Sequence, residues 1–134
     1  MGPWTHADAL NQWTAKQATE RVAQEAEKKR DKPRAWLVLS GFAKALAGVI
    51  AVGTYGAKKH APDVWKGDGF TMEDALDACG RHMLKFASGE TLDPEHGESH
   101  LAAAAWNLLA AEEKRVRRLN SSFSSYSKVR FLSE

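Results

Sequence analysis

The feature that most constrains the fold of this chain is the absence of any alternating run of β-branched residues long enough to form a strand. Alanine, leucine, glutamate and lysine dominate nearly every segment instead, and these residues favour helices. The sequence therefore predicts an all-α fold, a compact helical bundle. With 134 residues, the chain has the size of one domain and can bury one core. We expect a single domain over residues 1–134.

Composition distinguishes three parts of that domain. Residues 1–30 are polar and alanine-rich, which predicts a peripheral helix over residues 5–29 that ends before Pro33. Residues 31–119 carry the apolar stripes of a helical core. Residues 120–134 form a serine-rich tail with spaced aromatic residues, either a loosely ordered arm or a segment that docks on a neighbouring subunit.

Residues 35–57 are almost wholly apolar and contain a single charged residue, Lys44. Four glycines and several alanines dilute the stretch, which favours a buried helix over a membrane span. The spacing of its apolar residues predicts a helix over residues 34–53 that ends in glycines. Its buried stripe, which would also suit a contact between subunits, contains Trp36, Leu39, Ala43, Leu46 and Ile50.

Two further helix starts are marked by capping residues. Thr71 is followed three residues later by Asp74, a near match to a capping box. The apolar face of that helix contains Met72, Ala75, Leu76, Cys79, Met83 and Phe86. Asp93 followed by Pro94 predicts an N-cap and first helical residue for the last helix, which runs to about residue 119. Its apolar stripe is predicted to contain Leu101, Ala104, Ala105, Leu108, Leu109 and Val116.

The last helix also carries a polar stripe. His100, Asn107 and Lys114 recur at seven-residue steps and therefore share one side of the helix, beside the apolar stripe. The small residues Ala103 and Ala110 surround them. Because asparagine is unfavourable inside a helix, this alanine-lined polar stripe indicates room for a ligand.

Charge and cysteine content narrow the functional classes. The net charge of +2, from 19 Lys and Arg against 17 Asp and Glu, is weak evidence for a protein whose affinity rests on neutralising nucleic-acid phosphates. The single cysteine, Cys79, excludes a disulfide framework within the chain and suits a reducing compartment. No N-terminal pattern typical of secretion is present, so we expect a cytoplasmic protein.

The densest chemistry lies between residues 77 and 107, where two predicted helices flank an acidic loop that holds, with its borders, three of the five histidines. Mg²⁺ prefers oxygen ligands and needs only one or two protein carboxylates when it also holds substrate phosphates. The hairpin therefore predicts a metal site. Structural roles stay open for the same residues, with Asp93 as a helix cap, Glu95 as a first-turn acid and His82 as a hydrogen-bonded, partly buried residue.

Three segments, "DKPRAWLVL", "TYGAKKHAPDVW" and "RHMLKFASGETLDPEHGESHLAAAAWNLL", resemble in order and spacing the phage-associated dATP/dGTP diphosphohydrolase family, which is related to the all-α, MazG-like nucleoside triphosphate pyrophosphohydrolases. The resemblance implies a helical, oligomeric enzyme, dimer or tetramer, in the cytoplasm of the host cell. It further implies that Mg²⁺ or Mn²⁺ supports cleavage of a purine deoxynucleoside triphosphate between the α and β phosphates.

Roles are expected for positions that match the family, and also for Asp77 and Trp106, which are candidates from the residue pattern alone. Asp77, Glu90, Asp93 and Glu95 are expected to hold the metal, and Asp77 or His82 to activate the attacking water. Lys58, Lys59 and Arg81 would engage phosphates. The remaining substrate-binding positions are Arg34, Tyr55, Trp65, His100 and Asn107, and Asn107 has the donor and acceptor needed to read a purine edge. Trp65 and Trp106 would flank a base-sized pocket.

The chain departs from the family pattern at several positions. His60, Val64, His96 and Ala103 replace Tyr, Asn, Ser and His, and Ser40-Gly41 replaces a Pro-Glu pair. MazG-like enzymes bind metal through two helical carboxylate pairs, whereas here only Glu90-x-x-Asp93 keeps such a spacing clearly, in a loop, with Asp74 and Asp77 as a possible replacement on a helix. Either the metal site is built differently or catalysis is weakened or lost.

Two alternatives to an enzyme therefore stay open. A non-catalytic helical module would retain nucleotide or protein recognition without turnover. A nucleic-acid accessory protein would use the basic segments "EEKRVRRLN" and "SKVRF". The small net charge of +2 disfavours the nucleic-acid accessory protein.

Overall fold

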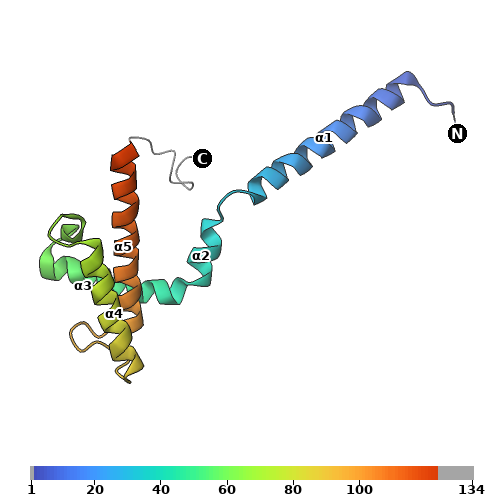
Figure 1. Ribbon diagram of the computed structural model, residues 1–134. Coiled ribbons are helices and arrows are strands. Elements are labelled where there is room, and N and C mark those ends of the chain that lie inside the picture. The colour runs from blue at the N-terminus through green and yellow to red at the C-terminus, as the bar shows by residue number, and fades with distance from the viewer. Residues whose placement is uncertain (1, 124–134) are drawn as a thin grey trace. The chain divides into compact units, whose positions relative to one another are not determined.

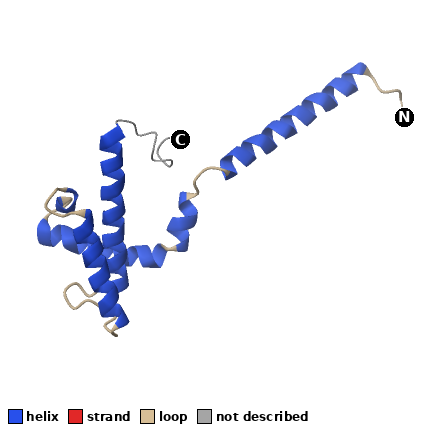
Figure 2. Cartoon of the chain, in the orientation of Figure 1, coloured by secondary structure: helices blue, strands red, loops and turns tan. Residues whose placement is uncertain are grey.

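The computed structural model describes residues 2–123, and it confirms the all-α fold (Figure 1, Figure 2). The chain divides into two units between Leu37 and Val38. From residue 124 onward, the predicted tail lies outside the described residues. The helices are α1 (His6–Arg30), α2 (Ala35–Gly41), α3 (Ala43–His60), the 3₁₀-helix η1 (Val64–Lys66), α4 (Met72–Ala87) and α5 (His100–Phe123).

Helix α1 begins with a capping box. The Thr5 side chain accepts a hydrogen bond from Asp8 N at 3.2 Å, and the Asp8 carboxylate accepts one from Thr5 N at 2.9 Å, which satisfies two donors at the helix start. Basic residues in the last turn interact favourably with the negative end of the helix dipole. No residue of α1 is buried. The predicted helix over residues 5–29 is therefore confirmed to within one residue.

The predicted single helix over residues 34–53 is wrong in both its continuity and its end. It is broken at Phe42, whose backbone lies at φ −113° and ψ 21°, between α2 and α3. Hydrogen bonds nevertheless run through the break, from Phe42 N to Val38 O and from Leu46 N to Phe42 O. No single helix among the described residues is long and apolar enough to cross a membrane, and α2 with α3 passes that test only as a pair bent by 85°.

Helix α3 continues to His60, and two of its glycines, Gly48 and Gly53, are packing positions. A Cβ atom at Gly48 would lie 3.3 Å from Ala102 Cβ, and one at Gly53 would lie 2.7 Å from Trp106 Nε1. The missing side chains let α3 approach α5 closely. The predicted buried stripe is also wrong, because Val49 and Val52 are buried, whereas Trp36, Leu39 and Ile50 are exposed.

Helix α4 starts as predicted, with a capping box between Thr71 and Asp74, and packs along α5 (Figure 1). Only part of its predicted apolar face is buried. Ala75 and Cys79 are buried, whereas Leu76, Met83 and Phe86 are exposed. The core around Ala75 is completed by Ala110 and Ala111, with Trp65, Phe70, Met72 and Trp106 packed against it.

Helix α5 begins at His100, so the predicted N-cap at Asp93 is wrong. Asp93 lies in the loop, where its side chain accepts a hydrogen bond from Glu95 N at 2.9 Å. The Ser99 side chain takes the capping role by accepting from Leu101 N at 3.0 Å.

The buried face of α5 is the polar, alanine-lined stripe rather than the predicted leucine stripe. His100, Ala103, Asn107 and Ala110 are 0%, 1%, 7% and 2% exposed. Leu101, Leu108 and Leu109 are exposed, although Ala104 from the same predicted stripe is buried. The narrow alanine face allows α3 and α4 to pack closely on α5.

Candidate metal centre and adjoining pocket

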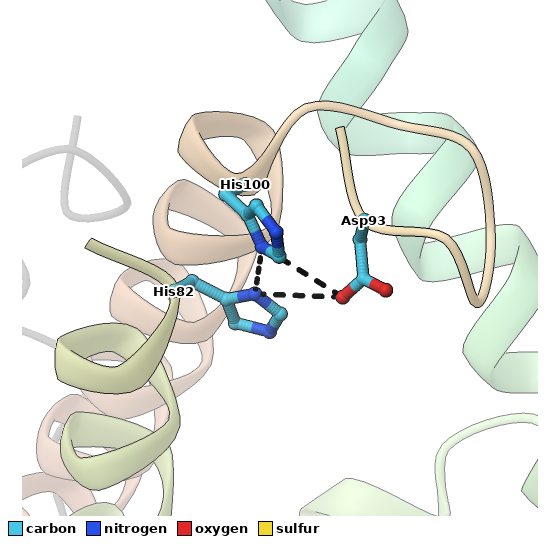
Figure 3. Close-up of side chains that lie close together, drawn as sticks. All are labelled: His82, Asp93 and His100. Carbon is cyan, nitrogen blue, oxygen red and sulfur yellow. Dashed lines mark hydrogen bonds and ion pairs between the residues drawn. The ribbon is translucent and has the colours of Figure 1, made fainter. Parts of the chain in front are cut away.

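Three side chains from different parts of the second unit converge on one point (Figure 3). His82 comes from α4, Asp93 from the loop before α5, and His100 is the first residue of α5. The two Nδ1 atoms lie 2.9 Å apart. Asp93 Oδ2 lies 3.7 Å from His82 Nδ1 and 3.8 Å from His100 Nδ1. This group is a possible three-residue metal site.

The loop that delivers Asp93 is closed by backbone hydrogen bonds. Asp93 N donates to Glu98 O at 2.8 Å, Gly97 N donates to Asp93 O at 2.8 Å, and His100 N donates to Thr91 O at 2.9 Å. Gly97 has a φ of +78°, a conformation that glycine adopts without steric cost. The loop therefore holds the Asp93 carboxylate beside the first turn of α5.

Hydrogen bonds indicate which ring nitrogen carries the proton when the neighbouring imidazoles are neutral. His100 Nε2 lies 3.1 Å from Glu90 Oε1, and because a carboxylate only accepts, Nε2 carries the proton. Neutral His100 then presents an unprotonated Nδ1 to His82. Glu98 N donates to His96 Nδ1 at 3.1 Å, so neutral His96 carries its proton on Nε2, which lies 3.6 Å from Asp93 Oδ2.

The environment favours neutral His82 and ionised Asp93. Burial lowers the pKa of His82, outweighing the opposite effect of Asp93. Burial raises the pKa of Asp93, but the hydrogen bond from Glu95 N and the neighbouring imidazoles leave it below its usual value. Neutral imidazole and carboxylate are the forms that bind metal ions.

A pocket of about 500 Å³ adjoins this centre and includes His82 and Asp93 in its lining. That volume falls within the range of small-molecule sites. The end of α3, the connection to η1 and the start of α5 supply the rest of the wall. The predicted positions that line it are Tyr55, Lys59, Trp65, His82, Asp93, Glu95 and Asn107.

One part of the lining is charged. The Lys59 ammonium pairs with the Glu95 carboxylate, and Tyr55 donates its hydroxyl hydrogen to the same oxygen at 3.3 Å. The hydrogen bond between the pair raises the pKa of Lys59 and lowers the pKa of Glu95. The contact links the end of α3 to the loop that carries Asp93.

Another part of the lining is aromatic. Trp65 and Trp106 meet edge to face, with ring centroids 5.7 Å apart and planes at 76°, and Phe70 also lines the pocket. Asn107 is buried beside them and donates one amide hydrogen to Ala103 O at 2.9 Å. This wall offers flat apolar surface together with one amide.

The backbone between α3 and η1 is strained where it lines the pocket. Ala61 has a φ of 102°, which its side chain strongly disfavours, and Asp63 has a φ of 64°, in the left-handed region that aspartate tolerates. Pro62 lies between them, and all three residues line the pocket. The strained turn brings the chain from α3 to Trp65.

The other predicted site residues lie outside the pocket lining. Asp77, Lys58 and Arg81 are exposed, and Arg34 belongs to the N-terminal unit. Of the four carboxylates expected to hold metal, Asp93 alone belongs to the three-residue group. Glu90 is hydrogen-bonded to His100, and Glu95 is paired with Lys59.

The pocket also contains residues to which the sequence assigned no role. His96 and Phe70 line it. In the sequence, His96 stood out as a histidine of the acidic segment and as a departure from the family pattern. His82 and His100, predicted as catalyst and substrate contact, lie with Asp93 in the group that could hold a metal ion.

Comparisons with known proteins identify the family of this chain. No curated protein and no solved structure matches it. The family model described as "dATP/dGTP diphosphohydrolase, N-terminal" matches residues 22–121, most of the chain. The chain therefore belongs to the dATP/dGTP diphosphohydrolase family, through a match to its N-terminal domain.

Proposed function

We propose that this chain hydrolyses purine deoxynucleoside triphosphates such as dGTP or dATP, with Mg²⁺ or Mn²⁺, to the monophosphate and pyrophosphate. The observation that carries the proposal is the composition of one pocket. His82 and Asp93 of the candidate metal centre line it together with Lys59 and with the aromatic pair Trp65 and Trp106. A nucleoside triphosphate presents a matching set of groups, namely anionic phosphates and a flat base.

The reaction adds one water molecule to the substrate. The water oxygen forms a bond to the α phosphorus, the bond from that phosphorus to the bridging oxygen breaks, and the bridging oxygen leaves with pyrophosphate. A divalent cation would supply charge neutralisation for the phosphates. The protein would contribute alignment and cationic contacts, which account for most of the catalysis in phosphoryl transfer.

Lys59 is the predicted phosphate contact that lies in the pocket lining. Its ammonium is held by Glu95, and an arriving phosphate would compete for it. Release from Lys59 would raise the pKa of the Glu95 carboxylate toward its usual value, because the main cause of its lowering is that hydrogen bond. We therefore assign Glu95 as the group that accepts the proton of the water. The two residues predicted from the sequence for this role suit it less well, because Asp77 lies exposed and His82 directs its Nδ1 to His100.

The base would occupy the aromatic wall. Indole surfaces stack on any nucleobase, so Trp65 and Trp106 would supply affinity without selecting a base. Asn107 keeps a second amide hydrogen and a carbonyl oxygen beyond its bond to Ala103 O. These are the groups that would read a purine edge.

We also propose that the chain forms a homo-oligomer, a dimer or tetramer. Ile50, Leu76, Met83, Leu108 and Leu109 are 66%, 43%, 55%, 54% and 57% exposed. Large apolar side chains this exposed on α3, α4 and α5 are candidates for burial in a protein contact. A second copy would bury apolar side chains that the described chain leaves in water.

The test of the reaction is incubation with each common NTP and dNTP plus Mg²⁺ or Mn²⁺, with separation of all products. Purine dNTPs should give monophosphate and pyrophosphate, and isotopically labelled water should place its oxygen in the monophosphate. Release of orthophosphate would show that a bond other than the one between the α and β phosphates is cleaved. Thermal stabilisation by nucleotide without turnover would instead identify a non-catalytic binding module.

A further inference from the structure

We propose that His82, Asp93 and His100 bind a transition-metal ion of the Zn²⁺, Co²⁺ or Fe²⁺ class in preference to Mg²⁺, with Glu90 as a positioning residue behind His100. The ligand atoms would be the two Nδ1 atoms and Asp93 Oδ2 (Figure 3). Mg²⁺ would then accompany the triphosphate as part of the substrate.

The spacing of the three atoms fits an ion better than it fits hydrogen bonds. Asp93 Oδ2 lies 3.7 Å and 3.8 Å from the two Nδ1 atoms, too far for hydrogen bonding. The Nδ1 atoms are themselves 2.9 Å apart, so a hydrogen bond could join the two imidazoles but not the carboxylate. The centre of the circle through the three atoms lies about 2.0 Å from each, which is the bond length of Zn²⁺ to imidazole nitrogen and carboxylate oxygen.

The hydrogen bonds around His100 prepare its Nδ1 as a ligand. Glu90 accepts the Nε2 proton at 3.1 Å, so the lone pair of neutral His100 is on Nδ1 and points at His82 Nδ1. A carboxylate behind a ligating imidazole is a recurring feature of metal sites, where it sets the tautomer and increases basicity. Glu90 thus serves the site without touching the ion.

Burial makes it costly to leave the polar atoms of this group without partners. The His100 side chain is 0% exposed, and those of Asp93 and His82 are 9% and 21% exposed. Because Nδ1 of His100 presents a lone pair at this depth, Nδ1 of His82 must meet it through a proton or through a cation. One proton could bridge the imidazoles but would leave Asp93 Oδ2 beyond hydrogen-bond distance, whereas one cation would satisfy all three groups.

The ligand types decide the class of ion. Imidazole nitrogen suits Zn²⁺, Co²⁺ and Fe²⁺, and two histidines with one carboxylate form a known arrangement that leaves coordination positions open. Mg²⁺ prefers oxygen ligands in octahedral geometry, and the described group offers only one oxygen. Since His82 and Asp93 also line the pocket, the open positions would face bound substrate.

The test measures binding without using activity. The full-length protein is stripped with a chelator and dialysed against Zn²⁺ or Co²⁺ in the presence of excess Mg²⁺. We expect one Zn²⁺ or Co²⁺ per chain, a visible Co²⁺ absorption spectrum typical of nitrogen ligation, and a raised melting temperature. Failure to retain either ion, or their displacement by Mg²⁺, would overturn the proposal.

Variants locate the site. His82→Ala and Asp93→Asn should each weaken Co²⁺ binding by at least about 100-fold and change its spectrum, whereas His60→Ala, in the same pocket lining but outside the group, should bind as wild type. Unchanged binding in both ligand variants would place the ion elsewhere. If either variant fails to fold, the wild-type Co²⁺ spectrum still decides, because ligation by oxygen alone contradicts the proposal.

Glu90 is tested by its two replacements. Glu90→Ala should weaken Co²⁺ binding by about 10- to 100-fold, and Glu90→Gln, whose amide oxygen still accepts from His100 Nε2, should restore part of it. Equal affinity in wild type and both variants would remove the positioning role. Tight Co²⁺ binding without nucleotide hydrolysis would leave this metal site intact and overturn the proposed function, and hydrolysis without such binding would do the reverse.

Discussion

Gly53 of α3 lies directly against the indole of Trp106 on α5, so that a Cβ atom at position 53 would come within 2.7 Å of Trp106 Nε1. Both residues also line the pocket beside the candidate metal centre. The contact sets how closely α3 approaches α5, and with it where the aromatic wall lies.

Gly53→Ala should destabilise the protein by about 1–3 kcal/mol, because the added methyl group overpacks the contact with Trp106. Gly56→Ala is the matched control on the same helix. Nothing lies within 4 Å of a Cβ atom there, so this change should stabilise the helix by about 0.5–1 kcal/mol. Urea unfolding measures both, and equal effects at the two positions would contradict the close packing.

Ala61→Gly should stabilise the protein by about 1 kcal/mol, because glycine removes the strain of the positive φ at this position. Ala47→Gly, at an exposed position inside α3, should instead destabilise it by about 1 kcal/mol through lost helix propensity. Thermal unfolding of the two variants gives the comparison. A loss of stability at both positions would mean that Ala61 is not strained.

Lys59→Ala should lower kcat/KM for the purine triphosphate roughly tenfold or more, because it removes a charged phosphate contact from the pocket. Lys58→Ala should stay within about twofold of wild type, since Lys58 is exposed and outside the lining. Steady-state kinetics on both variants make the test. Equal losses would show that the two lysines act through the overall charge.

Leu109→Asp should shift the protein toward monomers, because it places a charge on an apolar residue that is 57% exposed in the single chain. Arg118→Asp lies nine residues further on, about 180° around the same helix, and should leave the assembly unchanged. Light scattering over a range of concentrations reports the mass. A monomeric wild-type protein would contradict the proposed oligomer.

The capping box of α4 should make stability depend on pH in the acid range. Hydrogen bonds from Thr71 hold the pKa of Asp74 below its ordinary value, so the ionised form is favoured in the folded state. Its contribution is complete above the unfolded pKa of about 3.9 and is lost as the pH falls through the lower folded value. The stability advantage of wild type over Asp74→Asn should therefore shrink on acidification. Urea unfolding across the acid range measures it, and a constant difference would argue against the shift.

The starts of α1 and α4 were predictable because their causes are local. The capping boxes at Thr5 and Thr71 each join residues three positions apart, so the pattern of types carries the information. The end of α3 was not predictable in this way. Helix propensity places an end at Gly53, but contact with Trp106, more than fifty residues later, makes glycine the required residue there.

The sequence by itself determined the helical class, the family and several residues of the pocket, because composition, capping and motif spacing are properties of neighbouring residues. The tertiary structure decided which of those residues meet. Closure of the loop between Thr91 and His100 sets Asp93 beside two histidines that lie 18 residues apart and pairs Glu95 with Lys59 instead. It also decided that the alanine-lined polar stripe of α5, rather than its leucines, faces the interior. Close packing of α3 and α4 on α5 requires small side chains, and this requirement cannot be read from one helix alone.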